Sequence, residues 1–260
     1  MSELEFSIVV PVRSESSILS STLPSCYSLG PREVIVCLDD PPNLTDLKAV
    51  EYIAEKCGWK DTTKILKVPE NPACLNQLAW QRRQGFLAAS NDRILSTDAD
   101  LILNRNVRKS LLRVGKDNVG YASCTTIYPV NGTVRFCQSV VHGLVSRFRP
   151  PTLTGLYALW RPYWLDSEDY GIRLLRWRAG EDRYLLNCMK KNHRAIHLRQ
   201  AAAYSLRPYH TVADAQAQYE LGSQYANAKL QSWSVFLRSV ALLQPHLFRG
   251  YVDQLETKRT

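Results

Sequence analysis

The chain has 260 residues, of which 45% are hydrophobic and 22% are charged, and its formal net charge is +9. These fractions are typical of globular proteins and exclude disordered, fibrous and collagen-like chains, and the length predicts one large domain or two small ones. No apolar run approaches the roughly 18 residues of a membrane-spanning helix, and the acidic start, Met1 to Glu5, lacks the pattern of a secretory signal. We therefore expect a cytoplasmic protein.

The basic charge and the cysteines indicate the kind of binding partner and the redox compartment of the protein. The charge favours anionic partners, such as phosphate-bearing ligands or an acidic membrane face. Because the 33 Lys and Arg residues form no block of five or more, and no RNA-binding motif is present, we expect no nucleic acid as a partner. The seven cysteines include no CxxC pair, which predicts a reducing compartment and argues against a disulfide framework or a zinc ribbon.

Strand and helix signals alternate over the first hundred residues. Apolar residues at helical spacing predict helices over residues 45–57 and 73–90. Segments rich in apolar and β-branched residues predict strands at 6–12, 34–38, 64–68 and 93–97. Alternating strands and helices imply right-handed crossovers, so this part should form a mostly parallel, doubly wound α/β sheet.

After residue 103 the pattern becomes mixed. Asn131-Gly132 is a strong type I′ hairpin signal between two strand-like segments. Pro245 should end an apolar helix at 233–243. The remaining expected elements are strands at 119–126, 133–139 and 195–198, and helices at 181–191 and from residue 212 onward.

Charged side chains follow three of the predicted strands, namely Arg13 and Glu15, Asp39 and Asp40, and Asp98 and Asp100. Ligands of open parallel sheets bind at the carboxyl ends of the strands, so we expect one site there. Two carboxylates one residue apart can hold a hard divalent cation, which takes oxygen ligands and bridges to phosphates. Asp residues also end strands as simple turn formers. A role as turn formers is more plausible for Asp39 and Asp40, which precede two prolines, than for Asp98 and Asp100, which lie between two apolar runs.

Four motifs resemble those of family 2 glycosyltransferases, which have the GT-A fold. They are Phe6-Ser-Ile-Val-Val-Pro-Val-Arg-Ser-Glu15, Glu33-Val-Ile-Val-Cys-Leu-Asp-Asp40, Arg93-Ile-Leu-Ser-Thr-Asp-Ala-Asp100 and Gly180-Glu-Asp-Arg-Tyr-Leu-Leu186. Their order and spacing match the family over roughly residues 5–200. The family usually has Gly-Ser after the two acids of the second strand, where this chain has Pro41-Pro42. The base contact is therefore assigned to either Asp39 or Asp40.

The resemblance implies a nucleotide-diphosphate-sugar donor, UDP- or GDP-linked. Its implied nucleotide-binding residues are Pro11, Arg13, Glu15, Asp39 or Asp40, Arg82 or Arg83, and Asp98. The first three would line the nucleobase and ribose pocket, and one of the arginines would reach the nucleotide or its phosphates.

For the chemistry, the resemblance implies a metal ion and a carboxylate base. Asp100 would ligate Mn²⁺ or Mg²⁺ in a DXD motif, with Asp98 beside the metal and His210 as a third ligand. Asp182, or less favourably Glu181, would be the general base for the acceptor hydroxyl, and in-line attack would invert the anomeric carbon. Acids in a first helical turn also simply complement the helix dipole. The pair Glu168-Asp169 is a weaker competitor for the role of base.

Gly155 and Trp160 match the family's segment that faces the acceptor and the donor sugar. A glycine there would let the backbone approach the sugar closely, and the tryptophan would offer a stacking surface. Aromatic residues at this density are also common in a core. The acceptor would be a sugar, a small molecule or a lipid-linked molecule.

The expected architecture is α/β and GT-A-like, with a mostly parallel nucleotide-binding sheet that continues into a mixed sheet. Residues 1–103 would be the nucleotide-sugar-binding half, 104–210 the acceptor-binding and catalytic half, and 211–260 a C-terminal helical extension. Apolar residues nearly surround the segment from Trp233 to Tyr251, which favours packing or a homodimer over peripheral contact with the inner face of a membrane.

Other classes remain as alternatives. A retaining glycosyltransferase would keep Asp98 and Asp100 without needing Asp182. A nucleotidyltransferase on a related sheet would also want paired acids at strand ends, but it usually has a glycine-rich phosphate loop, and residues 11–17 contain no glycine. The non-enzymatic alternative is a basic nucleic-acid-binding protein, whose binding would weaken steeply with salt.

Overall fold

A computed structural model describes residues 4–13, 16–70, 77–127, 155–166, 189–206 and 245–257, together with the single positions 185, 219, 232, 235, 236 and 239. Contacts divide the chain into two compact units, and the first contains residues 1–127, 151–177 and 181–206. The second unit contains residues 128–150, 178–180 and 207–260.

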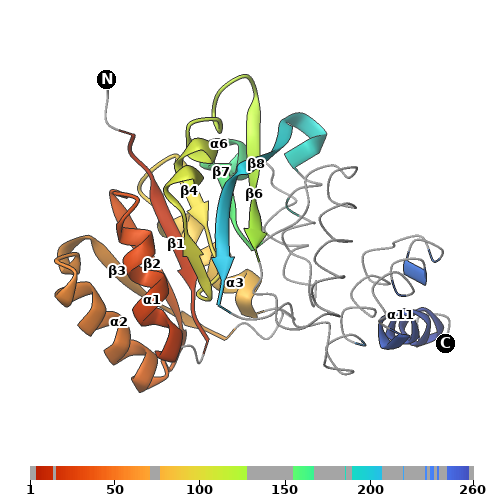
Figure 1. Cartoon of the computed structure of the whole chain (residues 1–260), viewed down its shortest axis with the longest axis horizontal. Helices are drawn as coiled ribbons and strands as arrows, with labels where there is room; N and C mark the ends of the chain where they lie inside the picture. The colour runs from red at the N-terminus through yellow and green to blue at the C-terminus, as the bar shows by residue number, and fades with distance from the viewer. Residues whose placement is uncertain are drawn as a thin grey trace. The chain divides into compact units, whose positions relative to one another are not determined.

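The strands of the first unit form one eight-stranded sheet in the order β3-β2-β1-β4-β7-β6-β8-β5 (Figure 1). In chain order, they are β1 Ser7–Pro11, β2 Glu33–Asp40, β3 Thr63–Pro69, β4 Arg93–Ser96, β5 Leu101–Leu103, β6 Val119–Ile127, β7 Tyr157–Trp160 and β8 Arg194–Ser205. Strands β3, β2, β1 and β4 are mutually parallel, as the alternating pattern predicts. Strand β7 is antiparallel to β4 and β6, and β5 is antiparallel to β8, so the predicted continuation into a mixed sheet is confirmed.

The described helices are α1 Ser16–Tyr27, α2 Leu44–Lys56, α3 Gln77–Ala88, α4 Arg108–Leu111, α6 Arg161–Asp166 and α11 Pro245–Thr257, with short 3-10 turns at Lys60–Thr62 and Arg105–Val107. Helix α2 starts one residue before the predicted range because the Asn43 side chain caps it, accepting a hydrogen bond of 2.9 Å from the Thr45 amide. Pro245 begins α11, at a helical position that tolerates the missing N–H. Most of the predicted helix at 233–243 lies outside the described residues. Among the described helices, none has the length and apolarity needed to cross a membrane.

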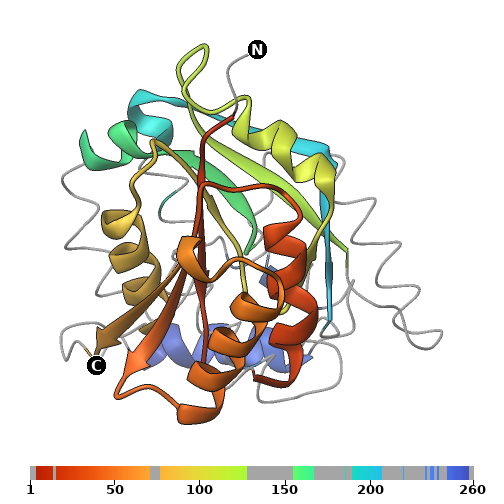
Figure 2. The same cartoon turned by 90° about the vertical axis from the view of Figure 1, so that its left-hand side faces the viewer.

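Helices cover both faces of the parallel part of the sheet. Along β1, Ile8 and Val10 pack into one apolar cluster with α1 and α2, whereas Val9 packs into a second cluster with Ala79 and Phe86 of α3. Figure 2 shows this arrangement, with the red β1 between α1 and the gold α3. Successive strand residues therefore face different helices, and this alternation decides where each polar residue at a strand end points.

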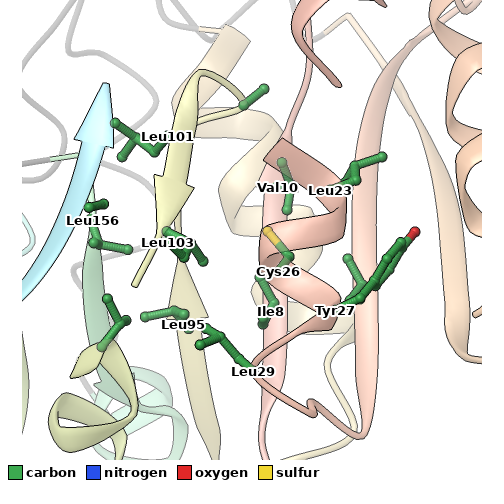
Figure 3. Close-up of a cluster of buried hydrophobic side chains, with 14 of the residues drawn as sticks. Ile8, Val10, Leu23, Cys26, Tyr27, Leu29, Leu95, Leu101, Leu103 and Leu156 are labelled. Carbon is green, nitrogen blue, oxygen red and sulfur yellow. The ribbon is translucent and has the colours of Figure 1, made fainter. Parts of the chain in front are cut away.

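Helix α1 is not among the predicted elements. Its sequence contains five serines and Pro24, which all weaken a helical signal. Tertiary packing nevertheless makes it a helix, since Leu23 and Cys26 lie on its buried face beside β1 (Figure 3). The Ser25 hydroxyl also accepts a hydrogen bond of 2.9 Å from the amide of Leu103, which ties α1 to β5.

The second half of the sheet differs from the prediction in three places. Strand β8 runs over Arg194–Ser205, well beyond the predicted 195–198, and β5 and β7 are additional strands. Strand β8 pairs in parallel with β6 through two register irregularities, and such irregularities weaken the period-two pattern by which a long strand is recognised. The predicted strand at 133–139 and the turn at Asn131-Gly132 lie outside the described residues.

Candidate active site

The carboxyl ends of β1, β2 and β4 lie side by side at one edge of the sheet. Val9 of β1 pairs with Ile35 of β2 and with Ser96 of β4, so the residues that follow each strand are close neighbours. Pro11 is the last residue of β1, is buried and pairs with Cys37. This edge is where an open parallel sheet binds its ligand.

The Asp39 carboxylate is held by side chains from two other elements. Its Oδ1 accepts hydrogen bonds from the side-chain amides of Gln77 and Gln81, each at 3.0 Å. Its Oδ2 lies 3.4 Å from Nε of Arg13, the residue that follows β1 by two positions. Gln81 is fully buried, and its amide also lies 3.4 Å from the Val12 carbonyl, so it connects the ends of β1 and β2.

The two acids at the end of β2 have different surroundings. Asp39 has the same strand parity as Ile35 and Cys37, which pack on the α3 side of the sheet. Asp40 has the opposite parity and is exposed. Of the two predicted candidates, the structure brings only Asp39 together with Arg13 and α3. Sequence reasoning missed Gln77 and Gln81, although their spacing of four residues places both amides on one face of the predicted helix.

Asp98 and Asp100 occupy a tight turn between β4 and β5. The turn is closed by a hydrogen bond of 3.3 Å from the Leu101 amide to the Asp98 carbonyl. The Asp98 carboxylate forms an ion pair with Arg82 of α3, whose side chain is only 3% exposed. The Asp100 carbonyl accepts a hydrogen bond of 2.8 Å from the amide of Leu206, next to the end of β8.

The two adjacent arginines of α3 point in different directions. Arg82 reaches Asp98, whereas the guanidinium of Arg83 lies 5.3 Å from the ring centroid of Trp80 on the same helix. Consecutive helical residues are about 100° apart around the axis, so only one of the pair can face the strand ends. The structure brings Arg82, and not Arg83, together with the acids of the site.

Gly155 lies directly against Asp98. A Cβ atom built on Gly155 would overlap the Asp98 carboxylate, so only glycine leaves room for both groups. Trp160 is at the opposite end of β7, paired with Arg93 at the amino end of β4. Its ring lies 5.0 Å from the Arg93 guanidinium. The structure therefore brings Gly155 to the site but does not bring Trp160 there.

The remaining predicted site residues, Glu15, Glu181, Asp182 and His210, lie outside the described residues, and their roles stay predictions. Within the described ranges, no group of three His, Cys, Asp or Glu side chains is arranged to hold a metal ion. Among the described residues, Asp39, Asp98 and Asp100 are acids at this edge with which a cation or a nucleotide could interact.

A mixed sheet whose parallel half ends in clustered acids and a buried arginine has the arrangement that the GT-A resemblance implies, with its ligand site at the carboxyl ends of the parallel strands. Residues 7–177 match the family model for glycosyl transferase family 2, and the chain belongs to this family. It is a glycosyltransferase that depends on a nucleotide sugar.

Solved structures show the same fold at low sequence identity. The chain is similar to S. aureus TarS, residues 1–349, with a TM-score of 0.57 and 16% identity over 87% of this chain and 67% of that one. It is also similar to GalNAc-T7, solved with UDP, GalNAc and Mn²⁺, with a TM-score of 0.60 and 16% identity over 88% of this chain. The match spans 52% of the GalNAc-T7 chain. No curated protein sequence matches the chain.

Proposed function

We propose that this glycosyltransferase moves a sugar from a UDP- or GDP-linked donor to an acceptor hydroxyl, with a divalent metal ion and with inversion of the anomeric carbon. The observation that carries the proposal is the convergence of Arg13, Asp39, Arg82, Asp98 and Asp100 at the carboxyl ends of three parallel strands. In this arrangement Asp39 accepts a hydrogen bond from the base, and the acids after β4 face the ribose and the diphosphate.

The residues present fit a divalent cation at Asp100. The Asp100 side chain is half-buried, and in the part of the chain that the structure describes it has neither a hydrogen bond nor an ion pair. Mg²⁺ and Mn²⁺ are commonly held by one or two carboxylates, with water and substrate phosphates as the remaining ligands. The bound ion would supply Lewis-acid stabilisation of the leaving diphosphate. The Mn²⁺ in the GalNAc-T7 structure supports this assignment.

Asp98 has a different role from Asp100, because its carboxylate is already paired with Arg82. We assign it the ribose and the water shell of the metal, and Asp100 the direct contact. Asp182, with Glu181 as the alternative, accepts the proton of the acceptor hydroxyl as that oxygen attacks. Identification of the product anomer by NMR tests the inversion, because a retaining enzyme would return the configuration of the donor.

The proposal is tested by thermal unfolding of the wild-type chain and of Asp100→Ala, with UDP or GDP and with or without MnCl₂. A ligand at a hundred times its Kd adds about 2.7 kcal/mol of stability, a shift of several degrees. We expect a Mn²⁺-dependent shift that Asp100→Ala abolishes. Asp92→Ala is the matched control, since Asp92 is exposed and precedes β4, at the strand's other end. Wild-type behaviour in Asp100→Ala would remove Asp100 from the site, and no shift with either nucleotide would remove the proposal.

A further inference from the structure

The hydrogen bonds that the Asp39 carboxylate already accepts determine which nucleobase can bind to it. A carboxylate has about four acceptor positions, two on each oxygen. On Oδ1, the amides of Gln77 and Gln81 take both positions, each at 3.0 Å. Oδ2 forms an ion pair with Nε of Arg13 at 3.4 Å. Within the described residues, Oδ2 is therefore the oxygen of Asp39 that can still accept a hydrogen bond from a ligand.

The orientation of the two glutamine amides follows from chemistry. An ionised carboxylate can only accept, so the amide nitrogen of each glutamine must face Asp39. For Gln81 the Val12 carbonyl is a second acceptor at 3.4 Å on the same nitrogen, which excludes the flipped amide. The Oε1 atoms of Gln77 and Gln81 are correspondingly buried, and neither has a hydrogen bond to another described residue. A buried acceptor without a hydrogen bond destabilises the fold, so the orientation that directs two donors to Asp39 has a cost in folding free energy.

Uracil and guanine differ in the number of N–H donors that they present to such a carboxylate. Uracil has one ring N–H, at N3, flanked by two carbonyl oxygens. Guanine presents two adjacent donors, the ring N1–H and the N2 amino group, which together need both oxygens of a carboxylate. With Oδ1 occupied, one of the guanine donors would be left without an acceptor, and a buried unpaired donor lowers affinity strongly. A uracil N3–H would be satisfied by Oδ2, and the Arg13 guanidinium beside it can donate to a neighbouring uracil carbonyl.

We infer that Gln77 and Gln81 are specificity-determining residues that position Asp39 for a single N–H contact, so that the donor is a uridine rather than a guanosine diphosphate sugar. The inference rests on the proposed function, in which Asp39 contacts the base.

The test is calorimetric titration of the full chain with UDP and with GDP, both in the presence of MnCl₂. The diphosphate and the metal are common to the two ligands, so the ratio of the two Kd values reports the base alone. We expect UDP to bind at least tenfold more tightly. If GDP binds as tightly as UDP or more tightly, the inference is wrong while the proposed function stands. If neither binds, the proposed function fails and this inference fails with it.

Two variants test the role of the glutamines. Gln77→Met and Gln81→Met keep the side-chain length and remove the donor, which frees acceptor positions on Oδ1. We expect the preference for UDP over GDP to fall at least fivefold in each, because guanine can then use both oxygens. Gln84→Met, on the same helix, is the matched control and should keep the wild-type preference. Gln77 is only half-buried, so its variant should fold even if the Gln81 variant does not. A folded Gln77→Met protein with unchanged preference would overturn the assignment.

Discussion

The buried guanidinium of Arg82 on helix α3 is paired with the carboxylate of Asp98 in the turn that follows β4. The Arg82 side chain is 3% exposed and that of Asp98 is 35% exposed. The pair therefore joins the interior of the fold to the open edge of the site. This ion pair fixes the orientation of the Asp98 side chain. The side chain of Asp100, two residues later, is not part of the pair.

Replacing Arg82 by methionine should weaken both folding and nucleotide binding. Removing one partner of a buried pair costs about 3–5 kcal/mol, and we expect about 1–3 kcal/mol here because Asp98 is partly exposed to water. An unanchored Asp98 should also lower the affinity for nucleotide at least tenfold. Urea denaturation and calorimetric titration measure the two effects.

Arg83→Met is the control for that substitution. Arg83 lies on the same helix but over Trp80, away from the acids. Its variant should keep the wild-type nucleotide affinity and lose less than about 1 kcal/mol of stability. Equal losses of affinity in the two variants would show that neither guanidinium acts through Asp98.

The sequence was sufficient to predict the four parallel strands β1, β2, β3 and β4 and their carboxyl ends, because buried parallel strands are apolar runs and acids directly follow two of them. It could not choose between Asp39 and Asp40, since that choice depends on which face of β2 lies against α3. It could not choose between Arg82 and Arg83 for a similar reason, because the rotation of a helix about its axis is set by packing.

Helix α1 and Gln81 show a second limit of sequence reasoning. Local propensity opposes a helix at Ser16–Tyr27, and only burial against β1 and β5 makes it favourable. Gln81 lacks a charge or a motif that would mark it, and its importance comes from contacts with Val12 and Asp39, 69 and 42 residues away along the chain. Contacts of this kind are visible only in three dimensions.

Gly155→Ala should reduce activity by more than its effect on stability explains. The added Cβ would overlap the Asp98 carboxylate, so that side chain must move. Displacing a site group by about 1 Å can cost roughly a hundredfold in rate, whereas overpacking costs about 1–3 kcal/mol of stability. Initial rates of sugar transfer and thermal unfolding measure the two effects.

Gly85→Ala is the matched control. There the new Cβ would come within 2.9 Å of Cys37 Sγ and would overlap Val9, both in the core between α3 and the sheet. This variant should lose similar stability but keep the wild-type rate at a temperature where it is folded. If Gly155→Ala kept full activity, the contact between Gly155 and Asp98 would be irrelevant to the site.

Cysteine reactivity should separate buried from exposed thiols. Burial raises the pKa of Cys26, Cys37 and Cys124 to about 12, so these thiols stay protonated and unreactive at neutral pH. Cys57 is exposed at the end of α2. Brief treatment of the native protein with iodoacetamide, followed by peptide mass mapping, should label Cys57 and leave the other three unmodified. All four should react in guanidinium chloride. Rapid native labelling of Cys37 would contradict the packing of α3 on β2.

Glu33 should make the free energy of unfolding depend on pH in the acid range. It lies at the start of β2, at the opposite end of the strand from Asp39, and is 3% exposed. Burial alone would raise its pKa, but bonds from Lys64, Ser7 and Ser90 outweigh burial and lower the pKa from 4.5 to about 2. The ion pair with Lys64 is 2.5 Å long, and the Ser7 hydroxyl donates at 2.6 Å.

Because the pKa is lower in the folded than in the unfolded chain, the stabilisation is fully present above pH 4.5 and is lost as the pH falls toward 2. Its size is at most about 3 kcal/mol, from 1.36 kcal/mol per pKa unit. Glu33→Gln should therefore be less stable at pH 7 and should lose stability less steeply between pH 5 and 2.5, as measured by urea denaturation. Glu55→Gln is the control, since its pair with Lys60 is exposed and should contribute less than about 0.5 kcal/mol. An unchanged pH profile in Glu33→Gln would mean that Glu33 does not connect β2 to its neighbours through its charge.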